Sequence, residues 1–254
     1  MNTALNSGIT FYKKTRRVVM NKKLTGLLAA LSLFGFSASA VQATIIDDFE
    51  DGSLSEYSAS LNTVAETAII GSGFAHDGNF GVGVGGDLQL DNGWIYRNDI
   101  VVSEGDTLSW WVNLGNTGRA YLGFGADAGG TQSFVLASNT GDIRFQDNAG
   151  WGFDSLDQSA QTFTLDQWYF AEVIWGTAGS VIGNLYGSDG TTLLNSVSST
   201  VSYSTSGGIA LRGFSQASFD TIEVNRNSVP EPATLMLMGL GLAGLGLSRK
   251  KKSA

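Results

Sequence analysis

Between residues 44 and 228 the hydrophobic positions occur in short runs that alternate with clusters of turn-forming residues. The runs recur roughly every 8–12 residues, and Gly, Ser, Thr, Asn and Asp fill the intervals between them. No apolar repeat of helical spacing continues for more than two turns. This pattern predicts an all-β domain built as an antiparallel β-sandwich.

Two segments show the strand pattern most clearly. In residues 107–114 every second side chain from Leu108 to Leu114 is apolar, so these side chains share one face of a strand. Residues 168–175 form the most apolar of the expected strands, with Tyr169 and Trp175 on a common face. Further strands are expected at residues 45–50, 67–70, 80–84, 88–90, 94–96, 121–125, 133–137, 143–145, 181–186, 192–197, 209–211 and 219–224.

Two of the intervals predict hairpin turns. Residues 91–93 read Asp-Asn-Gly and residues 188–190 read Ser-Asp-Gly, and both suit a tight connection between paired strands. Large apolar side chains contribute about 1.5–3 kcal/mol each when buried. The expected core positions are Trp110, Trp168, Trp175, Phe219 and Ile222.

The N-terminal segment has the layout of a secretory signal. Lys22 and Lys23 precede the apolar residues 24–36, and small residues then lead to Ala43, where we expect cleavage. We therefore predict a signal peptide with an apolar helix over residues 1–43, and Met20 is an alternative translation start. The other interpretation is an anchor that is not cleaved.

The C-terminal segment, residues 229–254, has three parts in a fixed order. A proline-containing motif comes first, the uncharged residues 233–247 follow, and a basic end closes the segment. A helix of 15 residues spans roughly 22 Å, which is short for a hydrocarbon core of about 30 Å. We predict a short transmembrane helix with its basic end in the cytoplasm; a buried helix ending a globular domain is the alternative. The motif is Val229, Pro230, Glu231 and Pro232, and the basic end is Arg249, Lys250, Lys251 and Lys252.

This order of motif, short apolar helix and basic end resembles the PEP-CTERM sorting signal of Gram-negative bacteria. The resemblance implies export by the Sec machinery and recognition and cutting by an exosortase-type membrane enzyme. After a transient stay in the inner membrane, the protein would reach the cell surface or the extracellular matrix. The signal indicates where the protein goes and leaves its activity open.

Charge separates the middle of the chain from both ends. Residues 44–228 contain no lysine, five arginines and 22 acidic residues, which leaves a net charge of −17. Such a charge argues against nucleic acid or an anionic membrane as a partner and is compatible with neutral glycans and divalent cations. The chain has no cysteine, so its stability must come from its own core.

Several segments of the middle region resemble a concanavalin-like jelly roll of the laminin-G type. They are residues 46–52, 165–173, 183–190, 208–212 and 218–224. The resemblance implies that the first and last strands lie side by side, which would place residues 47–50 near Asp220. It says little about activity, because many functions share one fold.

Catalytic chemistry finds little support in the sequence. His76 is the only histidine, no cysteine is present, and no Gly-x-Ser-x-Gly motif occurs. Glycoside hydrolysis needs two carboxylates, yet Glu172 has no acidic residue two or three positions away. We predict that the protein is not an enzyme. The alternative is a polysaccharide hydrolase, or a lyase that uses His76 with Asp77.

Two kinds of binding site are compatible with the sequence. Structural calcium needs oxygen ligands, which Asp48, Glu50 and Asp220 would supply if the first and last strands meet; solvated acids at strand ends are the alternative. Sugar binding needs aromatic rings beside polar groups, with a buried tryptophan as the alternative at each position. The candidates for sugar binding are Trp151 with Asn148 and Asp154, Trp94 with Arg97, and Trp111.

These observations predict a non-catalytic protein that is sorted to the surface and binds extracellular polysaccharide. A second interpretation is an acidic structural component of the matrix that has no specific ligand and associates through calcium. The third is a polysaccharide hydrolase or lyase.

Overall fold

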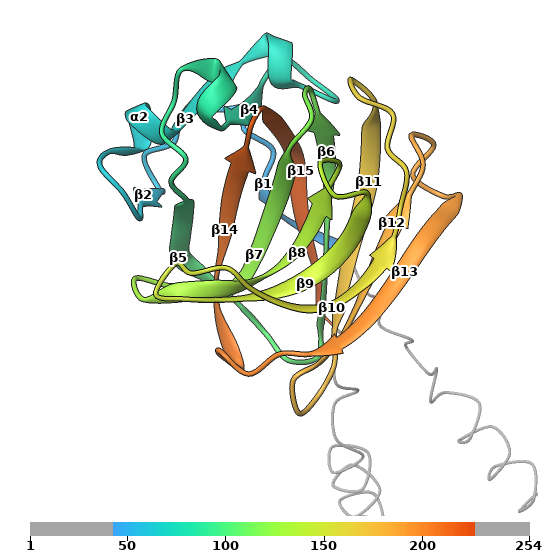
Figure 1. Cartoon of the computed structure of the whole chain (residues 1–254). Coiled ribbons are helices and arrows are strands. Elements are labelled where there is room, and N and C mark those ends of the chain that lie inside the picture. The colour runs from blue at the N-terminus through green and yellow to red at the C-terminus, as the bar shows by residue number, and fades with distance from the viewer. Residues whose placement is uncertain (1–42, 227–254) are drawn as a thin grey trace, which may run out of the picture. The chain divides into compact units, whose positions relative to one another are not determined.

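The computed structural model describes residues 43–226, which form two antiparallel β-sheets packed face to face (Figure 1). Ala43, the expected cleavage position, begins the first strand. The predicted signal helix, transmembrane helix, sorting motif and basic end lie outside the described residues. Within the described part of the chain, no helix is long and apolar enough to cross a membrane.

Sheet A contains eight strands. Its order is β13 (Leu193–Thr200), β12 (Ser180–Tyr186), β11 (Trp168–Trp175), β6 (Asp106–Leu114), β15 (Ala217–Arg226), β4 (Gly81–Val84) and β3 (Ala68–Gly71), and β1 (Ala43–Asp47) pairs with β15.

Sheet B contains seven strands. Its order is β10 (Asp154–Ala160), β9 (Asp142–Ala149), β8 (Gly130–Ala137), β7 (Arg119–Asp127), β14 (Ser206–Phe214), β5 (Ile95–Ser103) and β2 (Ser58–Ala59). The described helices are short: α2 (Val64–Thr67), η1 (Ser72–Phe74) and η2 (Gly86–Leu88).

The core lies between the two sheets because alternate side chains of each strand point inward. In β6 the side chains from Leu108 to Leu114 at every second position are buried, as predicted. Phe124 of β7 meets Trp175 of β11 across the sandwich, with ring centroids 5.0 Å apart. Both sheets and this core lie within residues 43–226, and we therefore expect that segment to fold as a unit.

The prediction of adjacent first and last strands is confirmed. β1 pairs with β15 along its length, and Asp47 lies opposite Ile222. Trp110, Trp175, Phe219 and Ile222 are buried as expected. The structure thus confirms the all-β antiparallel sandwich.

Three sequence predictions need correction. Trp168 is half-buried on the outer face of sheet A, because its neighbour Tyr169 takes the inward position in the strand. The expected strand at residues 88–90 and the hairpin around residues 91–93 are both absent, since residues 86–88 form η2 and Gln89 adopts a left-handed conformation at φ 63°. In addition, the edge strand β10 was not predicted, because its sequence is mostly polar and all of its side chains are exposed or only partly buried.

Candidate functional site

The outer face of sheet B carries a row of large side chains. Arg212 of β14 lies opposite Tyr121 of β7, which lies opposite Val135 of β8. Directly opposite residues of antiparallel strands share a face, so the three side chains point to the same side. That side is the outer one, because Leu122, the neighbour of Tyr121, belongs to the core between the sheets.

The connection between β9 and β10 folds over this outer face. Asn148 is fully buried, accepts a hydrogen bond from Ser133 Oγ at 2.6 Å and donates one to the carbonyl of Gly152 at 2.6 Å. Trp151 adopts a left-handed conformation at φ 61°, and its indole N–H donates to the carbonyl of Ala128. These bonds fix the connection and direct its aromatic side chains onto the sheet.

An aromatic cluster forms beneath that connection. Trp94 packs against Trp151 with centroids 5.7 Å apart, and against Phe153 at 6.4 Å with nearly parallel rings. Phe153 also meets Tyr121 edge to face at 5.8 Å. Trp94 is only 1% exposed, whereas Phe153 is 47% exposed, so Phe153 presents the accessible ring of this cluster.

A hollow of about 330 Å³ opens beside the accessible ring. Its lining combines three aromatic rings, two guanidinium groups and one amide. The lining residues are Arg119, Tyr121, Asn139, Phe153, Arg212 and Phe214.

Arg212 lies at the centre of this lining and is 6% exposed. Its guanidinium carbon lies 4.8 Å from the ring of Tyr121 and 4.6 Å from that of Phe153, and its Nε donates to the carbonyl of Asn92 at 2.9 Å. Its Nη1 is buried and has no hydrogen-bond acceptor among residues 43–226. Burial lowers the pKa of Arg212, because desolvation disfavours the charged form.

A second described hollow, of about 560 Å³, lies beside α2. Aliphatic side chains such as Leu54, Val64 and Ile69 dominate its lining, which contains no aromatic ring and no arginine. The hollow on sheet B therefore offers more specific recognition chemistry and is the candidate site.

The structure brings together only some of the predicted sugar-binding residues. Trp94 and Trp151 pack together, and Asn148 holds their connection in place rather than facing solvent. Asp154 is exposed at the start of β10. Trp111 lies on sheet A, so it belongs to a different surface.

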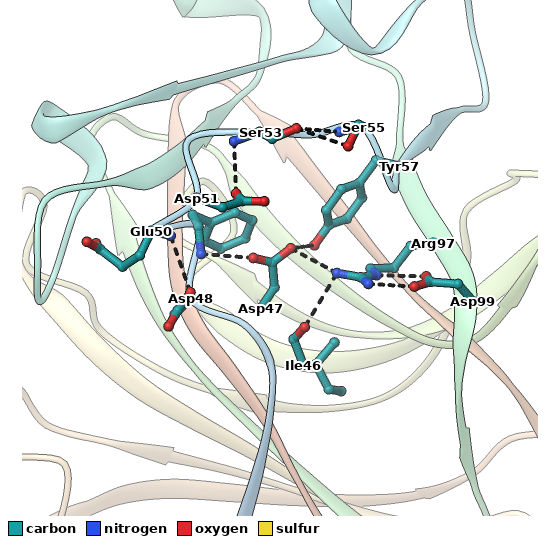
Figure 2. A network of polar contacts seen from close by, with 11 residues as sticks. Ile46, Asp47, Asp48, Glu50, Asp51, Ser53, Ser55, Tyr57, Arg97 and Asp99 are labelled. Atoms are coloured by element: carbon teal, nitrogen blue, oxygen red, sulfur yellow. Dashed lines mark hydrogen bonds and ion pairs between the residues drawn. The ribbon is translucent and has the colours of Figure 1, made fainter.

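Arg97 lies in a polar network away from the hollow (Figure 2). Its Nη1 donates to Asp47 Oδ2 at 3.1 Å, and its Nε and Nη2 donate to the two carboxylate oxygens of Asp99 at 2.8 and 2.6 Å. Tyr57 also donates to Asp47, at 2.9 Å. Burial raises the pKa of Asp47 despite these donors, and the hydrogen bonds from Arg97 lower the pKa of Asp99. Arg97 therefore has a structural role in this network.

The three candidate calcium ligands accept hydrogen bonds from the protein. Asp220 is buried and accepts from the backbone N–H groups of His76 and Asp77, while Glu50 accepts from those of residues 79 and 80. Asp48 accepts from the backbone N–H of Glu50. Residues 43–226 contain no group of three or more His, Asp or Glu side chains arranged to hold a metal ion.

His76, considered for lyase chemistry, packs on the outer face of sheet A. Its ring stacks on Trp111 with centroids 3.7 Å apart, and its Nδ1 lies 2.8 Å from Asp77 Oδ2. Trp168 contacts the same ring edge to face at 5.3 Å. This histidine thus contributes to an aromatic stack that covers sheet A.

The sequence analysis missed all six lining residues of the hollow. A signal for two of them was present: Arg97 and Arg144 each have an aspartate two positions away on the same strand face, whereas Arg119 and Arg212 have none. Arg226 also has none and lies outside the hollow, so this signal narrows the candidates without identifying the site.

Comparison with known proteins identifies the tail and the fold. Residues 228–250 match the family described as the PEP-CTERM protein-sorting motif. No curated protein matches the chain.

Several solved structures resemble the sandwich. The carbohydrate-binding module CBM66 from Bacillus subtilis has a TM-score of 0.51 at 11% identity, covering 67% of this chain and 95% of the module. A Bacillus subtilis protein of unknown function with a galectin-like fold gives 0.46 at 11%, with 67% and 88% covered. The exoplasmic/lumenal domain of VIP36, in a form bound to Ca2+ and Man2, gives 0.43 at 13%, with 68% and 81% covered. These identities establish similarity of fold alone. The chain is therefore an exported protein that carries a PEP-CTERM sorting motif behind a β-sandwich similar in fold to a carbohydrate-binding module.

Proposed function

We propose that this chain is a non-catalytic protein of the cell surface or extracellular polysaccharide matrix, and that it binds glycan in the hollow on sheet B. In this proposal the Sec machinery exports the chain, and an exosortase-type enzyme processes its tail. The sandwich then holds polysaccharide near the cell.

The observation that carries this proposal is the composition of the hollow. Sugars present C–H faces that pack on aromatic rings, and the exposed rings of Phe153 and Phe214 offer such planes. Sugar hydroxyls and ring oxygens need donors and acceptors, which Arg119, Asn139 and Arg212 supply. Pockets with this mixture of apolar walls and a few fixed polar groups are typical of small-ligand sites.

The same lining favours binding over hydrolysis. None of its six residues is an aspartate, glutamate or histidine. Glycoside hydrolysis requires a pair of carboxylates beside the scissile bond. The hollow therefore supports a role in holding saccharide.

A glycan array tests the proposal with residues 43–226 and the full-length chain in detergent. The Phe153→Ala variant removes the accessible ring, and we expect a loss of affinity of about tenfold or more, as for a central anchor of an interface. The matched control is Phe80→Ala, which instead removes an exposed ring from the residue just before β4.

Two results would count against the proposal. If neither polypeptide binds any glycan on the array, an acidic structural component without a specific ligand becomes the better interpretation. If Phe80→Ala weakens binding as much as Phe153→Ala, the saccharide lies elsewhere on the molecule.

A further inference from the structure

The five arginines of the acidic sandwich fall into distinct groups. Arg97 and Arg144 form ion pairs with aspartates, at 2.6 Å for Arg97 with Asp99. Arg119 and Arg212 form no ion pair within residues 43–226, and both line the hollow. Arg226 forms no ion pair there either and lies exposed on β15, so two of the three arginines that lack an anionic partner within residues 43–226 are found together at the candidate site.

The position of Arg212 is energetically unusual. Burying a guanidinium without a counter-ion is costly, and its Nη1 has no acceptor in the described part of the chain. The rings of Tyr121 and Phe153 offset part of this cost through cation–π contact. They also hold the guanidinium plane in one orientation at the wall of the hollow, which fixes the position of its charge before an anion arrives.

A carboxylate is the acceptor that fits this arrangement. A carboxylate carries the full negative charge that compensates the guanidinium, and a charge-assisted hydrogen bond between the two strengthens when the pair is desolvated. A neutral hydroxyl would satisfy one N–H group and leave the buried charge uncompensated. Arg119, held by Asn139 through Nε at 3.0 Å, adds a second positive charge on the wall of the hollow.

We propose that the hollow selects a sugar bearing a carboxylate, such as a uronic acid, and that Arg212 and Arg119 bind that carboxylate while Phe153 packs on the sugar ring. The proposal rests on the proposed glycan-binding function and names its ligand class. The net charge of −17 on residues 44–228 alone would disfavour an acidic ligand. At contact distance, however, the two arginines without a counter-ion outweigh the more distant negative charges. The acidic body also disfavours nonspecific association with polyanions, so binding of an acidic polymer would indicate a specific binding site.

A matched pair of polymers tests this ligand class. The full-length chain in detergent, and residues 43–226 in parallel, are titrated with polygalacturonate and with its carboxyl-reduced, neutral form. We expect binding to weaken at least about tenfold on reduction of the carboxyl groups, as for the loss of a charged hydrogen-bonded pair. Equal binding of the two polymers, or binding only of neutral glycans, overturns the acidic-sugar proposal and leaves glycan binding intact. If the chain binds no glycan, both the glycan-binding proposal and the acidic-sugar proposal fail.

Dextran sulfate against polygalacturonate forms the second comparison. We expect dextran sulfate to bind at least about tenfold more weakly, because the acidic body opposes nonspecific binding of polyanions and the sulfate esters of dextran do not reproduce a carboxylate fixed on the sugar ring. Equal affinity for both polyanions overturns the assignment to a carboxylate.

Charge-removing variants locate the contact. Arg212→Gln and Arg119→Gln should each reduce affinity for polygalacturonate about tenfold or more, and bring it toward that for the reduced polymer. Arg119 is half-buried, so its variant remains informative if Arg212→Gln does not fold. The control is Arg226→Gln, which removes the same charge from an exposed position on β15. If the control weakens binding equally, net charge rather than the hollow is responsible and the proposal fails.

Discussion

The buried network around Arg97 offers the sharpest test of what stabilises the sandwich. Arg97 joins β5 of sheet B to β1 of sheet A, because it donates to Asp47 and to the carbonyl of Ile46. Its side chain is 9% exposed and that of Asp47 is 11% exposed, whereas that of Asp99 is 50% exposed. The perturbation we consider is Arg97→Met, which keeps an apolar stem and removes the charge.

The structure sets the expected magnitude. Removing one partner of a buried ion pair typically costs about 3–5 kcal/mol, since the other charge stays buried without compensation. In the variant Asp47 retains donors from Phe49 N–H at 2.8 Å and Tyr57 Oη at 2.9 Å, so we expect the lower end, about 3 kcal/mol. Asp99→Asn removes only the half-exposed partner and should cost less than about 1 kcal/mol.

The pH dependence follows from the same contacts. Arg97 lowers the pKa of Asp47 against the stronger effect of burial, so its removal should raise that pKa further. The pKa of Asp47 in the folded protein lies above the value of about 3.9 for an unfolded aspartate. Protonation of Asp47 therefore stabilises the fold at pH values below about 3.9, and this stability is lost as the pH rises through the folded-state pKa. The deficit of Arg97→Met should therefore be full at neutral pH and shrink toward pH 3–4.

Urea unfolding of residues 43–226, followed by tryptophan fluorescence, measures these free energies, with Arg226→Met as the exposed control. An Arg97→Met cost no greater than that of Asp99→Asn, or a deficit that grows on acidification, would refute the reasoning.

Three further predictions concern the frame of the sandwich. Asp220→Ala removes a buried carboxylate that accepts three backbone N–H bonds, and should lower the unfolding free energy by about 3 kcal/mol in urea titrations; a change below about 1 kcal/mol would contradict this. Gly85→Ala should abolish folding, seen as loss of dispersed amide NMR signals, because Gly85 has φ +119° and an added methyl would overlap the carbonyl of Ser215. Hydrogen bonds from Thr192 lower the pKa of Asp189 to about 2, so its stabilisation should persist above pH 4 and disappear as pH falls toward 2. The unfolding midpoint of wild type relative to Asp189→Asn measures this, and a difference independent of pH would speak against it.

The fold could be predicted from the sequence because its strands alternate. Where one face is buried, as in β6, the period of two is visible in the residues themselves. β10 escaped prediction because neither of its faces is buried, and η2 was mistaken for a strand because Leu88 and Leu90 imitate the alternation. Trp168 was misplaced since hydrophobicity alone does not tell the inner face of a sheet from a covered outer one.

The candidate site was largely beyond sequence reasoning. Tyr121, Phe153 and Arg212 are distant in sequence and meet only through strand register and the crossing of the β9–β10 connection. Trp94 and Trp151 were predicted as separate sugar-binding candidates; their rings pack together at the base of the cluster, and Phe153 carries the exposed surface. Pairing of Arg97 with Asp47 depends on the meeting of β1 and β5, which composition does not show.

The central claim is that saccharide binds to the outer face of sheet B, and NMR shift mapping tests it most directly. Labelled residues 43–226 are titrated with oligogalacturonate, and backbone amide and arginine Nε–Hε signals are followed. We predict saturable shifts at Tyr121, Phe153 and Arg212, with no change at Trp111 on the opposite sheet. Shifts centred on Trp111, or none at millimolar saccharide, would contradict the account.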